Sequence, residues 1–245
     1  MPHHSATIFP RRLRRFLMLQ NNSTAVKPKV YMFKDYEHLA KLFYSGATFV
    51  AFDTETTGLE CQNDYLTEIG AVKFNCNGEI ARYDQLIRPP VKIPPFLVEL
   101  THITNEMVEN CPVASKVMSE FLSFLGDKET ILVAHNAQFD LGFLNMEMMR
   151  MGLSSVPNTT IDSLPLARWV YPEFKQEAEK GQYKLQTLAK RFNVEVLSAH
   201  RADDDARVLM EIFQRILKDS IPKQKDFDPS VMEKPVQTAS QLELF

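Results

Sequence analysis

A run of apolar residues, Thr48-Phe49-Val50-Ala51-Phe52, has the pattern of a strand buried on both faces, and it ends in Asp53-Thr54-Glu55. Residues two apart in a strand point to the same side, so both carboxylates are expected to project toward one place. Two anions about 6–7 Å apart repel each other, and a divalent cation between them relieves that repulsion. An Asp-x-Glu pair on its own is nevertheless more often solvated than functional.

The pattern around this strand predicts a mixed α/β sheet of five strands, flanked by helices, in a single domain. Residues 67–74 and 83–88 are two further strands joined by a turn at 75–78, and so short a connection indicates antiparallel neighbours. Strands and helices alternate after that, which adds parallel pairs. The remaining strands are expected at 130–134 and 159–162, and helices near 39–43, 96–126, 138–151, 184–192 and 202–217.

A second acidic motif, His135-Asn136-Ala137-Gln138-Phe139-Asp140, follows the strand at 130–134 directly. Asp140 falls in the first turn of the next helix. An acid at that position also has a purely structural explanation, because it interacts favourably with the positive end of the helix dipole.

The third motif is His200-Arg201-Ala202-Asp203-Asp204-Asp205, at the start of the last helix. Asp205 shares a helical stripe with apolar residues and therefore faces the core, where an acid has to be paired or bound to metal. Asp203 and Asp204 are expected to face outward, so Asp→Asn at either should matter far less than at Asp205. His200 is expected on the entering loop, over the same site.

In order and spacing, these three segments resemble the three motifs of the DEDD exonucleases. The histidine five residues before the last aspartate resembles the DEDDh branch, which includes the proofreading epsilon subunits of bacterial DNA polymerase III and the exonuclease domains of PolC-type polymerases. The resemblance implies a ribonuclease-H-like fold and 3′→5′ removal of nucleotides with two magnesium ions, for which Mn²⁺ can substitute. Four carboxylates suit such hard cations, and they are Asp53, Glu55, Asp140 and Asp205.

We expect His200 to act as a general base that takes a proton from the attacking water, because imidazole exchanges protons near neutral pH. The resemblance also implies a pocket for the terminal nucleotide, to which Leu59, Asn136 and Phe139 correspond. For Leu59 and Phe139, core packing is an equally good explanation. Gly58 would let the backbone approach the strand closely, and Thr56 would offer a hydroxyl contact.

Charge divides the chain into a basic start and an acidic body. The net charge of −3 hides +6 in residues 1–30, and so −9 in the remainder. An acidic body is unexpected for a protein held to nucleic acid by charge alone. We expect residues 1–29 to be a disordered basic extension, although a transit peptide or a nucleic-acid-binding arm has the same composition. Residues 30–218 would then be the exonuclease domain.

Residues 219–245 have the composition of a flexible tail, yet they end in Gln241-Leu242-Glu243-Leu244-Phe245. This ending resembles the QLxLF peptide by which bacterial replication proteins hold the sliding clamp. Gln241, Leu242, Leu244 and Phe245 would then bind this partner, with the apolar side chains as anchors.

No run approaches the ~18–20 apolar residues of a membrane span, and three scattered cysteines without a CxxC pair suit a reducing, bacterial cytoplasm. The function expected from all this is removal of nucleotides from single-stranded or mismatched DNA 3′ ends, in proofreading or repair. The alternatives are an RNA-trimming DEDDh exoribonuclease and a non-catalytic module recruited to the clamp. Whether the protein acts alone or with a replicative polymerase subunit stays open.

Overall fold

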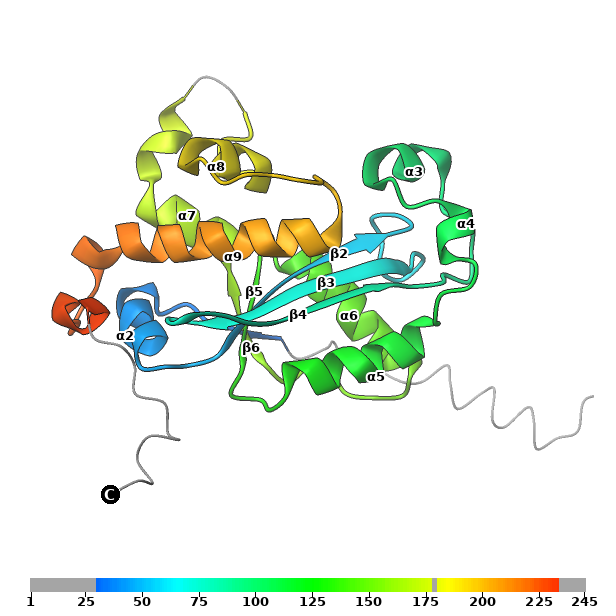
Figure 1. Ribbon diagram of the computed structural model, residues 1–245, viewed down its shortest axis with the longest axis horizontal. Coiled ribbons are helices and arrows are strands. Elements are labelled where there is room, and N and C mark those ends of the chain that lie inside the picture. The colour runs from blue at the N-terminus through cyan, green and yellow to red at the C-terminus, as the bar shows by residue number, and fades with distance from the viewer. Residues whose placement is uncertain (1–29, 178–179, 234–245) are drawn as a thin grey trace, which may run out of the picture.

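The computed structural model of the chain describes residues 30–177 and 180–233, which form three layers with a six-stranded sheet in the middle (Figure 1). The strand order is β1-β6-β5-β2-β3-β4. The β2–β3 and β3–β4 pairs are antiparallel, and the other pairs are parallel. The strands are β1 (Tyr31–Met32), β2 (Phe49–Thr56), β3 (Leu66–Asn75), β4 (Gly78–Leu86), β5 (Ile131–Ala134) and β6 (Thr159–Asp162).

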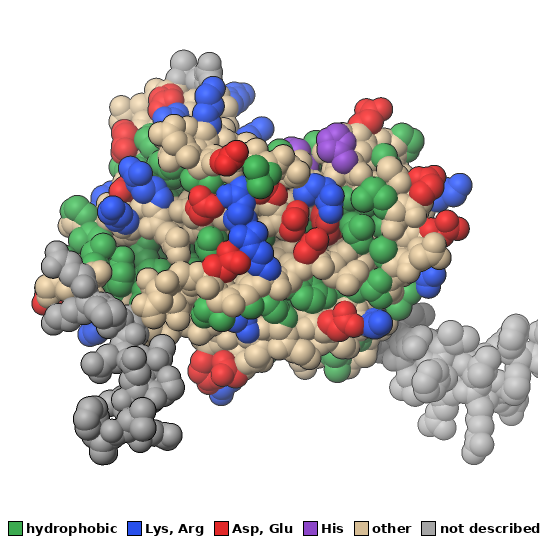
Figure 2. All heavy atoms as spheres, viewed as in Figure 1, with side chains coloured by type: hydrophobic (Ala, Val, Ile, Leu, Met, Phe, Trp, Pro, Cys, Tyr) green, Lys and Arg blue, Asp and Glu red, His purple; other side chains and the backbone are tan. Residues whose placement is uncertain are grey.

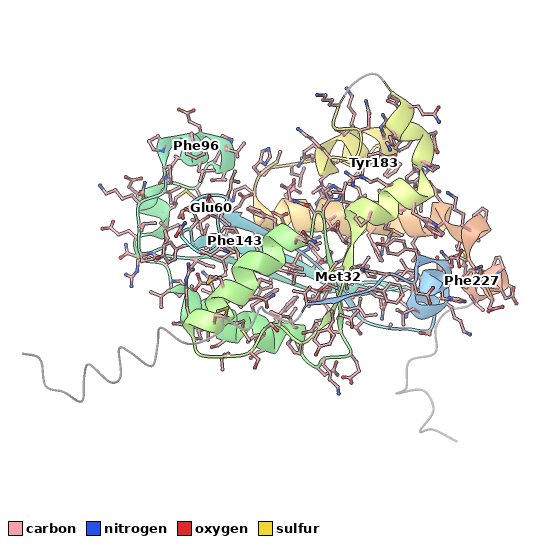
Figure 3. The ribbon with its side chains drawn as sticks, turned by 180° about the vertical axis from the view of Figure 1, so that it is seen from behind. Met32, Glu60, Phe96, Phe143, Tyr183 and Phe227 are labelled. Carbon is pink, nitrogen blue, oxygen red and sulfur yellow. The ribbon has the colours of Figure 1, made fainter. Side chains whose placement is uncertain are left out.

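Helices cover both faces of the sheet. One face carries α2 (Leu39–Tyr44), α7 (Ser163–Val170), α8 (Leu185–Phe192) and α9 (Ala202–Asp219). The other carries α5 (Ala114–Leu125) and α6 (Gln138–Arg150), with Phe143 of α6 seen from behind in Figure 3. Two short helices, α3 (Pro95–Thr101) and α4 (Asn105–Val108), lie beyond the carboxyl end of strand β4 (Figure 1).

Strand β2 is buried on both faces, as its apolar run predicts. Phe49 and Ala51 belong to the core under α9, whereas Val50 and Phe52 belong to the core under α5 and α6. Such a strand has no freedom to slip by one residue, because every side chain would change faces. The direction of Asp53 and Glu55 at its end is therefore fixed by the two cores.

The mixed α/β class and the antiparallel pairing after β2 are confirmed, while several boundaries differ from the expected ones. The sixth strand, β1, has only two residues, too few to show a pattern. The helix expected over 96–126 is three helices, because the chain turns left-handed at His102 and Thr104 then caps α4. Helix α7 was not predicted, because a proline such as Pro165 usually interrupts a helix. Here Pro165 lies in the first turn, and the Asp162 side chain caps the helix. Strand β4 begins at Gly78 rather than 83.

The packed body continues past residue 218, so the expected flexible tail does not begin there. The segment after α9 includes η3 (Ile221–Lys223) and η4 (Pro229–Glu233). Gln224 accepts a 2.9 Å hydrogen bond from the Ala40 amide, and Lys225 pairs with Glu37 at 2.5 Å. Polar composition was misleading because these contacts are made by polar groups.

Within the described residues, no helix is long and apolar enough to cross a membrane.

Helix α9 begins directly on strand β3, and Gly70 makes this possible. A Cβ atom at Gly70 would lie 2.1–2.2 Å from backbone atoms of Ala202 and Asp203. Only a residue without a side chain allows this approach of helix to strand. Since Asp205 lies in the same first turn, Gly70 sets the height of that carboxylate above the sheet.

Gly70→Ala is accordingly expected to destabilise the protein by about 1–3 kcal/mol, since the added methyl group meets backbone that has to move. Gly142→Ala is a matched control, because a Cβ there lies 3.5 Å from its nearest neighbour, the Cys61 sulfur. Urea unfolding should show Gly142→Ala to be neutral or stabilising, as expected for alanine inside a helix. Equal stabilities of the two variants would contradict the close approach.

Candidate active site

Asp53 and Glu55 lie where β2 extends beyond its neighbour β5. The last pair between these strands joins Ala51 to Val133, and β5 ends at Ala134. From there on, β2 is paired with β3 alone. Both carboxylates remain partly exposed and line the space that β5 leaves.

The chain that leaves β5 brings Asp140 into the first turn of α6. Asp140 is only 3% exposed, and its Oδ1 accepts a 2.7 Å hydrogen bond from the Thr54 hydroxyl. Thr54 lies between Asp53 and Glu55 in β2, so this bond fixes the helix against the strand. The helix dipole accounts for an acid in a first turn, but not for burying it beside two others.

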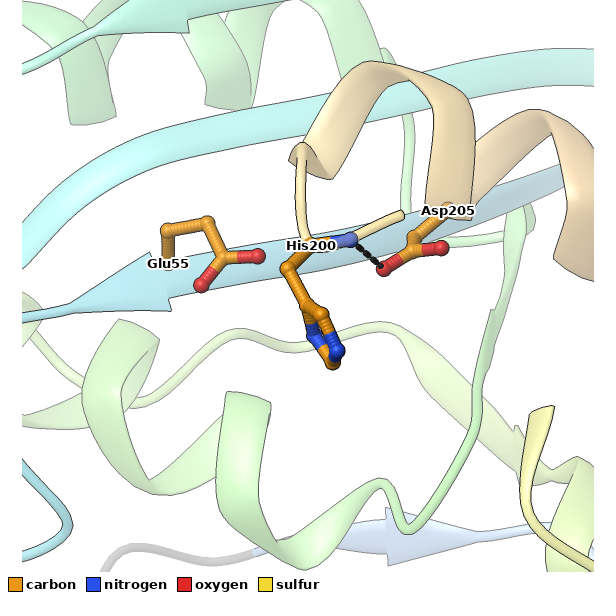
Figure 4. Close-up of side chains that lie close together, drawn as sticks. All are labelled: Glu55, His200 and Asp205. Atoms are coloured by element: carbon orange, nitrogen blue, oxygen red, sulfur yellow. Dashed lines mark hydrogen bonds between the residues drawn. The ribbon is translucent and has the colours of Figure 1, made fainter. Parts of the chain in front are cut away.

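Helix α9 and the loop before it supply Asp205 and His200 (Figure 4). Asp205 is 5% exposed; Gln186 Nε2 donates to its Oδ1 at 2.7 Å, and the His200 amide donates to its Oδ2 at 3.1 Å. The backbone of His200 is left-handed, with φ 62°, which costs a residue with a Cβ about 1–2 kcal/mol. The loop thus holds an exposed imidazole in a strained position beside a buried acid, as functional sites often do.

All five residues line one cavity of about 270 Å³. Ligand atoms of Glu55, His200 and Asp205 lie within 4.8 Å of one another, and Figure 4 shows His200 between the two carboxylates. The cavity also has lining residues that the sequence analysis did not single out: Thr54, His135, Lys184, Leu185 and Gln186.

The surroundings of the four carboxyl groups in this cavity disfavour their ionisation. Burial raises the pKa of Asp53 well above its usual range, and the charges of Asp140 and Glu55 add to the effect. Burial also raises the pKa of Glu55 to about 9 and that of Asp140 to about 7, and it raises the pKa of Asp205 above its usual value. Across residues 30–177 and 180–233, none of the four forms an ion pair with a lysine or arginine. The four acids therefore offer carboxylate oxygens without an ion-pair partner, and such oxygens fit hard divalent cations, which displace the protons when they bind.

Glu68 is a buried acid behind this cavity that sequence reasoning missed. It is fully buried on β3, opposite Glu55 in the strand register, and its carboxylate receives Arg201 Nη2 at 2.6 Å and the Ala202 amide at 2.8 Å. Glu68 thus anchors the first turn of α9, between His200 and Asp205. The available signal was a glutamate directly before the run Ile69-Gly70-Ala71-Val72 of a predicted strand.

Asp204 does not face outward, and that expectation is wrong. It is 5% exposed, and its Oδ2 accepts hydrogen bonds from the Leu197 and Ser198 amides, both at 2.7 Å. Arg207 Nη2 binds the other oxygen at 2.7 Å. Burial alone would raise the pKa of Asp204, but these hydrogen bonds outweigh it and lower the pKa. The loop that leads to His200 folds back over this side of α9, which helical periodicity does not reveal.

We therefore expect Asp204→Asn to destabilise the protein by about 1–3 kcal/mol, since an NH₂ group then faces a buried donor. Asp203→Asn, on an exposed residue of the same turn, should change stability by less than about 0.5 kcal/mol. Urea unfolding of both variants at neutral pH measures the difference. Two variants of equal stability would mean that Asp204 does not hold the loop.

Of the five residues expected to meet the terminal nucleotide, two line the cavity and three do not. Asn136, left-handed at φ 67°, and Phe139 line the cavity. Leu59 is 80% exposed, so it is not a core residue, but it does not line this cavity. Thr56 donates to the Gly58 carbonyl at 2.6 Å, and the Asp64 carboxylate fills the space where a Gly58 side chain would be. Gln241, Leu242, Leu244 and Phe245 are outside the described residues.

The sequence and the fold were compared with known proteins. Residues 50–213 match the RNase T exonuclease family. The chain is 42% identical over 187 residues to the DNA polymerase III subunit epsilon of Treponema pallidum, which covers 76% of this chain and 80% of that protein. It is 41% identical over 173 residues to the PolC-type DNA polymerase III of Halalkalibacterium halodurans, which covers 70% of this chain but 11% of that protein.

Among solved structures, Exonuclease X in complex with 5′ overhanging duplex DNA matches with a TM-score of 0.55 and 25% identity, over 75% of this chain and 96% of that one. The ribonuclease-H-like fold that the motifs imply is thereby confirmed. The chain belongs to the exonuclease family, and it is a 3′→5′ exonuclease, as the resemblance of its motifs to the DEDDh branch predicts.

Proposed function

We propose that the substrate is DNA and that nucleotides are removed from its 3′ end by hydrolysis at the cavity of Asp53, Glu55, Asp140, Asp205 and His200. The observation that carries this proposal is the gathering of four unpaired acids and one exposed histidine around a single cavity. The choice of DNA is supported by the 42% identical relative, which is named as a DNA polymerase subunit, and by the DNA complex of Exonuclease X.

Asp53, Glu55, Asp140 and Asp205 would hold two magnesium ions, which Mn²⁺ can replace. When bound, such ions neutralise the acids and stabilise charge on the attacking and leaving oxygens of the phosphodiester. The chain's own contribution is positioning: Thr54 orients Asp140, and Gln186 orients Asp205. Both contacts come from neutral donors, which lower the pKa of the two acids without cancelling the charge of the ionised form.

His200 would take the proton from the attacking water. The imidazole is exposed at the cavity while its own backbone amide is bonded to Asp205, so the base and one acid are fixed relative to each other. An exposed imidazole beside the acids supports this role, because a general base has to reach the proton that it removes.

We also propose that the enzyme serves proofreading or repair and is tethered to a sliding clamp by Gln241-Leu242-Glu243-Leu244-Phe245. Tethering raises the local concentration at DNA and would offset the weak attraction of an acidic body. Leu242→Ala with Phe245→Ala should abolish co-elution with a bacterial clamp and leave hydrolysis of free oligonucleotides unchanged. Retained clamp binding would refute the role of this segment.

The proposed reaction is tested with one 5′-labelled sequence in three forms: single-stranded DNA, mismatched primer–template and RNA, each with Mg²⁺ or with EDTA. DNA should give a ladder of progressively shorter labelled products that depends on Mg²⁺. Faster degradation of RNA would favour the RNA-trimming alternative. No degradation of any form would leave only the non-catalytic module.

A further inference from the structure

A second cavity lies beside the catalytic one, in the lobe formed by α7, η2 (Pro172–Gln176) and α8. It measures about 640 Å³, and Arg168, Lys175, Lys180 and Tyr183 are among its lining residues. Figure 3 labels Tyr183 in this lobe. We call this cavity the cationic hollow.

The hollow shares a wall with the catalytic cavity. Tyr183 lines the hollow, and the next residue, Lys184, lines the catalytic cavity. His135, also of the catalytic cavity, bonds through Nε2 to the Tyr183 carbonyl oxygen at 2.8 Å. Because a carbonyl only accepts, Nε2 carries the proton, and burial lowers the pKa of His135, which keeps the ring neutral. The two cavities are therefore neighbours, separated by the Tyr183–Lys184 backbone.

The charge of the hollow is opposite to that of the catalytic cavity. Arg168, Lys175 and Lys180 are all exposed, and no ion pair joins them to an acid in the described part of the chain. Glu177, the acid in the lining, is already paired with Arg191 at 2.5 Å. Blue side chains gather over this part of the molecule in Figure 2. On a protein with an acidic body, this is a local site for anions.

Two aromatic rings line the hollow, and each has an arginine over it: Arg191 lies 4.2 Å from the Phe174 centroid and Arg168 lies 5.7 Å from that of Tyr183. The ring of Phe174 also stacks on Tyr171 with centroids 4.9 Å apart. Phe174 is therefore in contact with both Tyr171 and Arg191, and it is the exposed cations of the hollow that could contact a nucleic-acid strand, through its phosphates.

We propose that the cationic hollow binds the part of the substrate strand that precedes the 3′-terminal nucleotide, with Lys175 and Lys180 contacting its backbone phosphates. This inference rests on the proposed function and names a second contact region for the same substrate. The cations of the hollow would bind the strand, and the acids would cleave it, so different side chains carry out binding and hydrolysis.

The test compares the full chain with the double variant Lys175→Ala/Lys180→Ala on two substrates. One is a single-stranded oligonucleotide long enough to reach the hollow, and the other is the p-nitrophenyl ester of thymidine 5′-monophosphate, which occupies the catalytic cavity alone. We expect KM for the oligonucleotide to rise about tenfold, with kcat/KM for the ester unchanged. The slope of log KM against log salt should fall by about 1.4, or ~0.7 for each lost phosphate contact.

The control is Lys116→Ala/Lys128→Ala, which removes two exposed lysines, one in α5 and one in the loop that follows it; α5 lies on the opposite side of the sheet from α8 (Figure 1). It should match the wild type on both substrates. If the wild type cleaves both substrates but the Lys175/Lys180 variant equals it on the oligonucleotide, or loses both activities alike, the inference is wrong and the proposed function stands. If the wild type cleaves neither, the proposed function fails and the inference fails with it.

Discussion

His200→Ala is expected to lower kcat on single-stranded DNA by about 10²–10⁴-fold, the range for removal of a general base. KM should change little, because the four acids and the cationic hollow remain. The prediction follows from the position of His200, whose imidazole is exposed at the cavity while its amide is bonded to Asp205. Steady-state hydrolysis of a labelled oligonucleotide with saturating Mg²⁺ is the measurement.

Two further variants separate the imidazole from the strained backbone. His200→Gly removes the side chain and also relieves the left-handed φ of 62°, so it should be as inactive as His200→Ala but more stable. Asn193→Ala places alanine at a similar φ of 55°, at the end of α8 and outside the cavity lining, and should keep full activity. Unchanged kcat in His200→Ala would remove the histidine from the mechanism.

The parts of the site that the sequence predicts depend on regular periodicity. The two-residue repeat of a strand places Asp53 and Glu55 together, and the helical stripe with Leu209 and Ile212 turns Asp205 inward. In the structure, Asp205 is buried and lines the same cavity as the other two. Periodicity is a local property, so a single chain segment is enough to show it.

The parts that were missed depend on contacts between distant segments. Glu68 is joined to Arg201 across 133 positions, and Asp204 is buried by a loop whose path no repeat describes. The cationic hollow combines residues of α7, η2 and the loop before α8. In these cases the partners lie outside the local pattern, whereas α7 was hidden by a local feature, the proline in its first turn.

Gathering the acids has an energetic consequence for the protein without metal. An acid whose pKa is raised on folding keeps its proton in the folded state at pH values where the unfolded chain has lost it. The folded state then binds more protons, so stability falls as pH rises from the unfolded value of ~4 through the folded value. For Asp140 that window ends near pH 7, and for Glu55 near pH 9. A cation that binds to the ionised acids would therefore stabilise the folded protein.

Asp53→Asn is therefore expected to have two effects of opposite sign. Hydrolysis should fall by about 10²–10³-fold or more, on the scale of losing one electrostatic contact to the reacting groups. In EDTA, the variant should be more stable than the wild type by about 2 kcal/mol at pH 8, because an unpaired buried charge is gone. At pH 5 the difference should be smaller, because the loss of stability begins only near pH ~4, where the unfolded chain starts to release the proton that burial retains on the folded carboxyl.

Urea unfolding in EDTA at both pH values tests this sign, and added Mg²⁺ provides the second readout. Mg²⁺ should stabilise the wild type more at pH 8 than at pH 5, because cations compete with protons for the same oxygens. It should stabilise Asp53→Asn much less at either pH. Asp203→Asn removes an exposed acid outside the cavity lining and should behave as the wild type in both respects. If instead Asp53→Asn is less stable than the wild type at pH 8 in EDTA, its carboxylate is compensated within the protein, and the case for a cation at this cavity loses its electrostatic basis.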